Sequence, residues 1–228
     1  MEVLYEDNHL IIVAKKVGEI VQGDKTGDRT LADDVKAYIK EMYAKPGEVF
    51  LGVTHRLDRP VSGICVFART SKGLARMNEL FRSGGVAKTY LALVQNLPPE
   101  PEGEIHSWLV RNEQQNKSYS WSHPKPGAKE ARLRYRLIGR GDHYALVAVR
   151  LLTGRHHQIR CQLASIGCPI KGDLKYGAKR SNPDGGISLH AWKIAFEHPV
   201  SHEQIEIKAP LPHDNLWQSF QIPELLDL

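Results

Sequence analysis

The sequence predicts an α+β fold, with a mainly antiparallel or mixed β-sheet flanked by helices. Short apolar or alternating runs bounded by turn residues are typical of strands, and they outnumber the segments with helical spacing. These strands and helices do not alternate regularly, which argues against a doubly wound parallel sheet. A length of 228 residues suits a single domain with a sizeable core, spanning residues 1–228.

The first half of the chain combines short strands with two helices. Thr30 and Asp33 resemble a capping box, and the apolar residues that follow predict a helix over 31–43. Ser71 can cap a second helix, which ends at Gly84-Gly85. Short apolar runs predict strands at 3–5, 10–14, 64–68 and 88–94.

The second half is richer in strands. Residues 97–103 are the clearest loop and could divide one domain into two halves. We expect a helix over 155–166 and a short docked helix or tail over 217–226. Strands are expected at 104–110, 131–138, 144–152, 187–196 and 204–207.

Cysteine usage predicts a reducing, cytoplasmic location. Cys65, Cys161 and Cys168 lie in apolar stretches and form no Cys-x-x-Cys pair, which disfavours a disulfide framework and a cysteine zinc site. The early apolar run at 10–14 is closed by two lysines and is too short for a signal sequence or a membrane span. We therefore expect no membrane association.

The charge favours a polyanionic partner. The formal charge is +5 and the pI is near 9.0. Residues 111–140 hold eight Lys and Arg against two Glu, whereas residues 1–50 carry a balance of −3. Trp108, Tyr119 and Trp121 are interleaved with these basic residues, a mixture expected where phosphates are bound and bases stack.

Two clusters of ionisable side chains could carry chemistry. Residues 55–59, His-Arg-Leu-Asp-Arg, precede Pro60 and Gly63, so a rigid loop can hold Asp58 toward a cleft. The alternative is a solvated turn with a local ion pair. Residues 153–160, Thr-Gly-Arg-His-His-Gln-Ile-Arg, place arginines at a predicted helix N-terminus, a natural anion site.

Zinc could be suspected at His156 and His157. However, adjacent histidines on a helix point in different directions, and no His-x-x-x-His spacing or carboxylate follows. We therefore expect no metal. Tyr90 shares a strand face with Ala92 and Val94, and Leu189 opens a late strand, so each alone would be an ordinary core residue.

Together and in this order, several motifs resemble the RluA-type family of RNA pseudouridine synthases. They are the 55–59 loop, Lys-x-Tyr at 88–90, the 153–160 segment, residues 167–173 with Tyr176-Gly177, and Leu-His-Ala at 189–191. The resemblance covers about residues 3–210. It implies the pseudouridine synthase fold with a central active-site cleft, and isomerisation of a uridine in RNA without a cofactor.

The resemblance also implies roles for single residues. Asp58 matches the essential aspartate, Arg160 the arginine that keeps it ionised and orients it, and Tyr90 the tyrosine that stacks on the flipped base. The carboxylate could attack carbon as a nucleophile or deprotonate a sugar carbon, and both routes remain open. Arg56 would fill the gap left by the flipped base, and Leu189 would keep water away.

The RNA contacts beyond these residues are predicted from charge. Arg155 and His157 would contact phosphates or bases, and Arg132, Arg134 and Arg136 would bind the RNA backbone. The alternative for these three arginines, which alternate with apolar residues, is an ordinary strand with one solvated face.

Two departures from the family pattern matter. Lys16 stands where the family commonly has proline in Lys-Pro-x-Gly, which puts the shape of that loop in doubt. Many relatives carry an S4-type RNA-binding module before the catalytic domain, whereas we expect none here. The catalytic domain itself would then have to bind the RNA.

Other functions fit less well. A hydrolase using Ser62 lacks a nucleophile-elbow sequence, and no P-loop or dinucleotide fingerprint is present. A catalytically inactive RNA-binding module of the same fold is the main alternative. We expect ribosomal or transfer RNA as the partner, and a monomer, but a single sequence does not reveal which uridine is the target.

Overall fold

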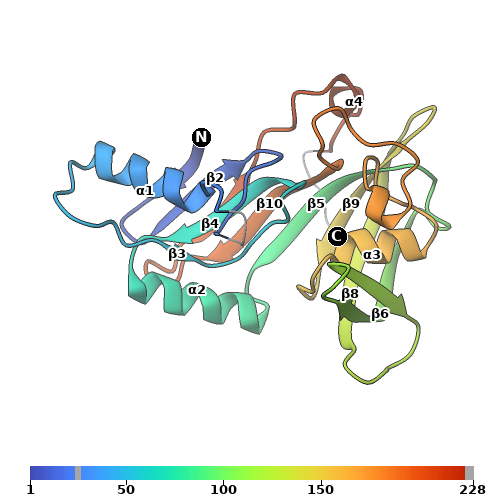
Figure 1. Cartoon of the computed structure of the whole chain (residues 1–228), viewed down its shortest axis with the longest axis horizontal. Coiled ribbons are helices and arrows are strands. Elements are labelled where there is room, and N and C mark those ends of the chain that lie inside the picture. Colours follow the sequence, from blue (N-terminus) through green and yellow to red (C-terminus); the bar gives the residue numbers. More distant parts are fainter. Residues whose placement is uncertain (24–26, 224–228) are drawn as a thin grey trace. The chain divides into compact units, whose positions relative to one another are not determined.

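The computed structural model describes residues 1–23 and 27–223, which form two compact units. Of the described residues, those within Met1–Ala87 and Ala191–Pro210 form unit 1, and those within Lys88–His190 and 211–223 form unit 2. The division that the sequence suggested near 97–103 falls inside unit 2, and the chain instead passes from unit 1 to unit 2 after Ala87. The α+β fold class is confirmed (Figure 1).

Unit 1 contains a sheet in the order β1-β2-β4-β10, with β11 beside β10 and β3 beside β4. The pairings of β1 with β2, β2 with β4, β3 with β4 and β10 with β11 are antiparallel. The strands are β1 (Glu2–Glu6), β2 (Leu10–Lys15), β3 (Gly52–Val53), β4 (Ser62–Ala68), β10 (Leu189–Glu197) and β11 (Gln204–Lys208).

Two helices belong to unit 1, α1 (Leu31–Met42) and α2 (Ser71–Ser83). The capping box at the start of α1 is confirmed: the Asp33 amide donates to Thr30 Oγ1 at 3.1 Å, and the Thr30 amide donates to Asp33 Oδ2 at 3.0 Å. The cap of α2 is Thr70 and not Ser71, because Thr70 keeps an extended backbone and its Oγ1 accepts from the Gly73 amide.

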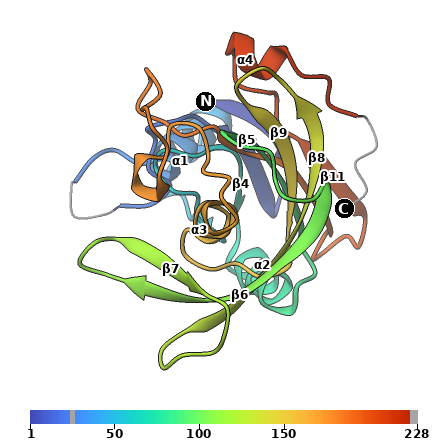
Figure 2. The ribbon, with the colours of Figure 1, turned by 90° about the vertical axis from the view of Figure 1, so that its right-hand side faces the viewer.

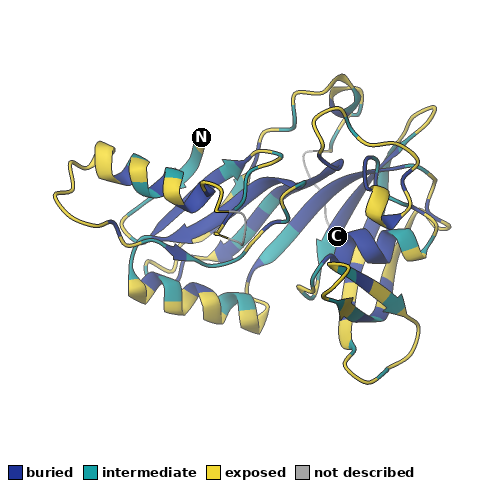
Figure 3. Ribbon diagram, viewed as in Figure 1, coloured by how far each residue is buried: buried dark blue, intermediate teal, exposed yellow. Residues whose placement is uncertain are grey.

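Burial on both faces explains why strands of unit 1 have unbroken apolar sequences. Every residue of β4 is buried, so both faces of this strand are covered (Figure 3). Met77 of α2 packs against a cluster that includes Leu10, Ile12 and Val66. The helix α1 lies on the other side of these strands (Figure 1).

Unit 2 contains a sheet in the order β5-β9-β8-β6-β7, with antiparallel pairings throughout this path. Its strands are β5 (Ala87–Val94), β6 (Glu102–Asn112), β7 (Lys117–Trp121), β8 (Lys129–Arg140) and β9 (Ala145–Leu151). The sequence did not predict β7, because its Lys-Ser-Tyr-Ser-Trp stretch lacks the apolar alternation of the other strands.

The helical segments of unit 2 are short. They are α3 (Gln158–Ser165), the 3₁₀ turn η1 (Leu174–Tyr176) and α4 (Asn215–Gln218). The predicted start of α3 at residue 155 was wrong, because His157 has a left-handed backbone with φ of 53° and separates residues 153–156 from the helix. Within the predicted 217–226 element, residues 224–226 lie outside the described residues.

The sheet of unit 2 has two chemically different faces. Along β6, Ile105, Ser107 and Leu109 are buried, whereas Glu104 and His106 are exposed. The buried side faces α3, because Gln162 Nε2 of that helix donates to Ser107 Oγ at 2.9 Å. The same alternation continues along β8, so α3 covers one face and solvent covers the other at this end of the sheet (Figures 2 and 3).

Asp7 organises the turn between β1 and β2. Its Oδ1 accepts from the His9 and Leu10 amides at 2.7 Å each, and its Oδ2 accepts from the Tyr5 hydroxyl at 2.9 Å and lies 2.9 Å from His198 Nε2. Burial alone raises the pKa of this carboxyl, but these donors outweigh burial and hold the pKa below its usual value.

This arrangement predicts a specific loss of stability in acid. Because the pKa of Asp7 is depressed in the folded state, its stabilising effect is complete above the usual carboxyl pKa of about 4 and is lost as the pH falls through the folded value. We expect Asp7→Asn to lower the free energy of unfolding by about 2 kcal/mol at pH 6 and to flatten its decline between pH 5 and 3. Urea unfolding at several pH values checks this, with the exposed Asp142→Asn as control.

None of the described helices combines the length and the apolar character that crossing a bilayer requires.

Candidate active site

The loop that carries Asp58 is fixed at several points in unit 1. Before it, Thr54 Oγ1 donates to the Val66 carbonyl at 2.6 Å, and His55 Nε2 accepts from the Val66 amide at 3.0 Å. Leu57 is buried, and the Val61 amide donates to the Asp58 carbonyl at 3.0 Å, which closes a turn. Asp58 itself is half-buried, so a rigid backbone presents a carboxylate that is not sealed into the core.

Lys15 supports the far side of this turn. The side chain is only 2% exposed, and its Nζ donates to the carbonyls of Val61 at 2.6 Å, Lys16 at 3.0 Å and Arg59 at 3.1 Å. Burial lowers the pKa of Lys15 to about 8, while nearby Cys65, Glu19 and Asp58 favour its charged form. The Gly18 amide donates to the same Arg59 carbonyl, so the segment stays tied to the turn although Lys16 replaces the family's proline.

Replacing Lys15 by methionine tests this support. The apolar side chain fills a similar volume but leaves buried carbonyl groups without their donor, so we expect the free energy of unfolding to fall by about 2–3 kcal/mol. If the turn holds Asp58 in its reactive position, turnover should also fall by about tenfold or more. Urea unfolding and a turnover assay measure both effects.

The exposed neighbour provides the control for this change. Lys16→Met alters the same kind of side chain at a solvated position and should leave both quantities nearly unchanged. A Lys15→Met protein as stable as the wild type would show that the buried ammonium does not support the turn.

Gly63 is required where the Asp58 loop enters β4. Its φ is +116°, and a Cβ at this position would lie 2.3 Å from the carbonyl oxygen of Ala191 in β10. A side chain here would force the two backbones apart, which explains the glycine that follows the loop.

In unit 2, Tyr90 lies on the face of the sheet that α3 covers. It is opposite Val149 of β9, which is opposite Tyr135 of β8, and paired residues share one face. Tyr90 is only 8% exposed. This burial agrees with the strand pattern, which alone would make Tyr90 an ordinary core residue, and its role at the flipped base stays a prediction.

Arg160 projects from α3 and forms a buried ion pair with Asp173. Arg160 Nε lies 2.7 Å from Asp173 Oδ2, and its Nη2 lies 2.9 Å from Asp173 Oδ1, so the contact is bidentate. The two side chains are 6% and 1% exposed. The sequence predicted Asp58 as the partner of Arg160; Asp58 belongs to unit 1 and Arg160 to unit 2, and that pairing stays a prediction.

The turn before α3 is held by side-chain hydrogen bonds. Gln158 Oε1 accepts from Thr153 Oγ1 at 2.8 Å and from the Arg155 amide at 3.0 Å. Tyr176 Oη accepts from the Ser118 amide at 2.8 Å and is hydrogen-bonded to His157 Nδ1 at 2.9 Å. Because His157 is buried and bonded in this way, the structure gives it a role in shaping the turn, and its predicted RNA contact stays a prediction.

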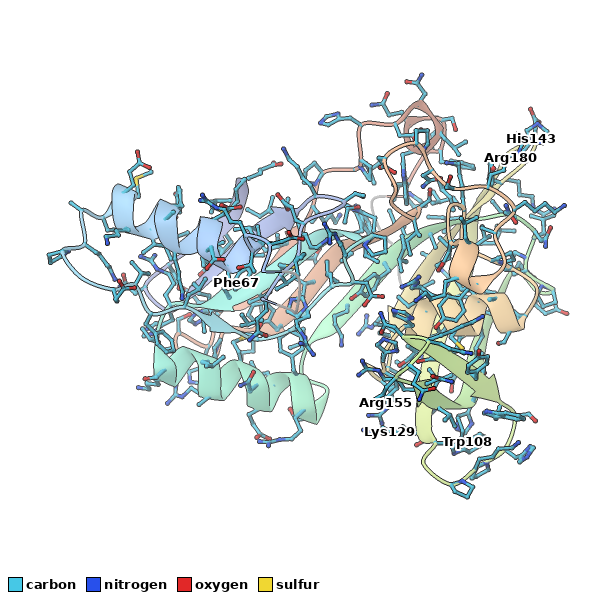
Figure 4. All side chains as sticks on the ribbon, in the orientation of Figure 1. Phe67, Trp108, Lys129, His143, Arg155 and Arg180 are labelled. Atoms are coloured by element: carbon cyan, nitrogen blue, oxygen red, sulfur yellow. The ribbon has the colours of Figure 1, made fainter. Side chains whose placement is uncertain are left out.

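The arginines predicted to bind RNA are not gathered around α3. Arg132 and Arg134 lie on the opposite, exposed face of the sheet, where both contact Glu104, at 2.7 Å and 3.4 Å. Arg136 pairs with Glu102 at 3.0 Å. Arg155 Nε donates to the Glu130 carbonyl, which places Arg155 beside the start of β8 (Figure 4).

The two remaining predicted residues, Arg56 and Leu189, lie in the loop and the strand that the sequence predicted for them. Arg56 is exposed in the Asp58 loop of unit 1. Leu189 is 4% exposed at the start of β10, and its role in keeping water from the base stays a prediction.

The sequence patterns assigned no role to two residues that hold predicted site segments: Asp173, which contacts Arg160, and Lys15, which supports the Asp58 turn. Asp173 stands at the end of the 167–173 motif, two residues after Lys171, but received no role. Lys15 was read only as the close of an apolar run. Nothing local in the sequence indicates that its ammonium group is buried.

In the part of the chain that the structure describes, no three His, Cys, Asp or Glu side chains are grouped so that they could hold a metal ion.

Comparison with known proteins identifies the family. Residues 9–165 match the family model described as RNA pseudouridylate synthase. The uncharacterized RNA pseudouridine synthase YlyB of Bacillus subtilis is 30% identical over 217 residues, which cover 94% of this chain and 70% of the relative. Ribosomal large subunit pseudouridine synthase C of Vibrio cholerae is 33% identical over 215 residues, which cover 92% and 65% of the two chains.

Solved structures agree with the fold. The human RNA pseudouridylate synthase domain containing 4 superposes with a TM-score of 0.78 at 24% identity, covering 93% of this chain and 89% of the human one. The family model spans more than half of the chain, and both bacterial relatives align over nearly all of it. The chain therefore belongs to the RNA pseudouridylate synthase family, whose members are isomerases that convert uridine in RNA to pseudouridine.

Proposed function

We propose that this chain converts uridines in structured ribosomal RNA to pseudouridine, with Asp58 as the reacting group. The observation that carries the proposal is the Asp58 loop: Lys15, His55 and the turn to Val61 fix its backbone, and the carboxylate that resembles the family's essential aspartate is left half-buried. The names of several relatives, which are large-subunit ribosomal enzymes, favour ribosomal RNA.

The reaction requires a balanced rearrangement of one nucleotide. The bond from C1′ to N1 breaks, a bond from C1′ to C5 forms, C5 loses a proton and N1 gains one, so nothing is oxidised or hydrolysed. A cofactor is therefore not required. We propose that Asp58 either attacks carbon or removes a proton from the sugar, and that a base accepts the C5 proton at the end.

The remaining roles follow from the family resemblance. Arg160 would keep Asp58 ionised, and its bidentate contact with Asp173 would hold the guanidinium in one orientation. Tyr90 would stack on the flipped base, and Arg56 would replace that base in the RNA stack. Leu189 would exclude water and so protect the intermediate from hydrolysis.

The setting of the reaction is also part of the proposal. The three cysteines are free and buried, which supports a reducing, cytoplasmic location. We propose a monomer acting on ribosomal RNA, with transfer RNA as the second candidate substrate.

Tritium release tests the activity directly. Purified protein and RNA labelled at C5 of uridine should release tritium to water, because C5 loses its hydrogen during isomerisation. Carbodiimide mapping of ribosomal and transfer RNA, from cells with and without the gene, would locate the modified positions. Binding of RNA without tritium release from either RNA class would favour the inactive RNA-binding module.

A further inference from the structure

The exposed face of the unit 2 sheet has two regions of different chemistry. At one region, Arg132, Arg134 and Arg136 are paired with Glu102 and Glu104, so opposite charges largely compensate each other. The second region contains aromatic side chains, and it lies where β6 pairs with β7. Figure 2 shows β6 and β7 running together as a two-stranded ribbon at one end of the unit 2 sheet.

The register places the aromatic side chains on one face. Trp108 of β6 is directly opposite Trp121 of β7, and Tyr119 is opposite Val110. Trp108, Tyr119 and Trp121 therefore share the face opposite α3, because Ser118, which precedes Tyr119 and points to the other face, is buried and contacts Tyr176 and His156. We call Trp108, Tyr119 and Trp121 the aromatic face.

The aromatic face is accessible to a partner. Tyr119 and Trp121 are each 39% exposed, whereas Trp192 and Trp217 are 6% and 3% exposed. Single exposed aromatic side chains such as Phe50 are ordinary, whereas Tyr119 and Trp121 lie on one face of the same strand and together offer a surface to a partner. Trp108 is labelled in Figure 4, at the end of unit 2 where β6 meets β8 and β7.

Cations accompany these rings. Lys125 Nζ lies 3.0 Å from the centroid of the Trp121 ring, and Lys117 Nζ lies 5.3 Å from the ring centroids of both Tyr119 and Tyr176. An exposed cation–π contact is weaker than the stacking of a nucleobase on an aromatic ring, so a base can displace the ammonium group. The released ammonium would then be free to meet the phosphate that accompanies that base.

We propose that the aromatic face binds unpaired nucleotides of the RNA substrate, by stacking bases on Tyr119 and Trp121 with Lys117 and Lys125 near their phosphates. This inference rests on the proposed function, since it assigns part of the RNA to a surface outside the predicted catalytic residues. Exposed aromatic side chains on an open sheet, flanked by cations, are a recurrent way to bind single-stranded RNA. A protein partner would explain the rings but would not require lysines beside them.

Binding of a fluorescent uridine dodecamer, measured by anisotropy, tests the proposal. A second oligomer with the same phosphates but abasic sugars removes the bases alone. We expect the wild type to bind the uridine oligomer more tightly than the abasic one, and Trp121→Ala to weaken uridine binding by about tenfold. Combining Trp121→Ala with Tyr119→Ala should remove most of the preference for bases and leave only the part that the Tyr90 site contributes.

Three comparisons separate stacking from charge and from the general effect of removing an exposed ring. Trp121→Phe keeps an aromatic ring and should bind within about twofold of the wild type. Lys125→Ala should reduce the slope of log affinity against log salt by about one, whereas Trp121→Ala should leave that slope unchanged. Phe50→Ala, which removes an exposed aromatic ring of unit 1, is the matched control and should change nothing.

The outcomes distinguish this inference from the proposed function. If the wild type releases tritium but the Tyr119 and Trp121 variants bind uridine and abasic oligomers as it does, the stacking surface is wrong and the enzyme assignment stands. If the variants lose base-dependent binding but the wild type releases no tritium from ribosomal or transfer RNA, the stacking surface is supported and the proposed activity is overturned.

Discussion

Replacing Asp58 by asparagine is expected to reduce tritium release by about 10⁴-fold or more while RNA binding persists. The amide has nearly the same shape as the carboxylate, but it is neither a nucleophile nor a base at neutral pH. Both routes open to Asp58 need the carboxylate, so both predict the same loss. Tritium release at saturating RNA, together with the dissociation constant for the same RNA, separates catalysis from binding.

The control for this change lies in the same unit. Asp28 is a solvated carboxylate 3.3 Å from Arg59, next to the Asp58 loop in the structure. Asp28→Asn also removes one negative charge near that loop, and it should retain turnover within about threefold. Full turnover in Asp58→Asn would refute the catalytic role, and equal losses in both variants would indicate a general effect of charge.

Much of the fold could be predicted from the sequence, because residues close together in the chain determine many of its elements. The capping box at Thr30, the left-handed glycine at Gly84 and the unbroken apolar run of β4 each depend on neighbouring residues alone. The start of α3 could not be predicted. His157 has a left-handed conformation there and contacts Tyr176, which lies outside the local sequence pattern. Strand β7 was missed because its Lys-Ser-Tyr-Ser-Trp stretch lacks apolar alternation, and its strand conformation depends on pairing with β6.

The candidate site shows the same limit. The 55–59 and 153–160 motifs identified the segments that carry Asp58 and Arg160. They could not show that Arg160 forms a bidentate contact with Asp173 or that Lys15 donates to three loop carbonyls, because these contacts depend on tertiary packing. The charge count over 111–140 likewise did not reveal that the β8 arginines face glutamates of β6.

The second large effect is expected at Asp173. Asp173→Ala would leave the Arg160 guanidinium, which is 6% exposed, without its bidentate partner in the interior of unit 2. Removal of one member of a buried ion pair costs about 3–5 kcal/mol, because the other charge stays desolvated. We expect a loss of this size in the free energy of unfolding, together with reduced turnover if Arg160 orients Asp58 as proposed.

An exposed ion pair on the same unit provides the comparison. Glu104 contacts Arg132 and Arg134, but their side chains are 44% and 56% exposed, so water can replace the carboxylate. Glu104→Ala should therefore change the free energy of unfolding by less than about 1 kcal/mol. Urea unfolding of both variants measures the difference, and equal losses would show that burial does not set the strength of these pairs.

A third variant distinguishes the loss of the Asp173 contact from the cost of keeping the Arg160 guanidinium buried. If the destabilisation comes from the desolvated guanidinium, then replacing Arg160 by leucine in the Asp173→Ala background should restore part of the stability. Turnover should not return with it, because the proposed partner of Asp58 would still be absent. Recovery of stability without recovery of activity would separate the structural role of the pair from its role in catalysis.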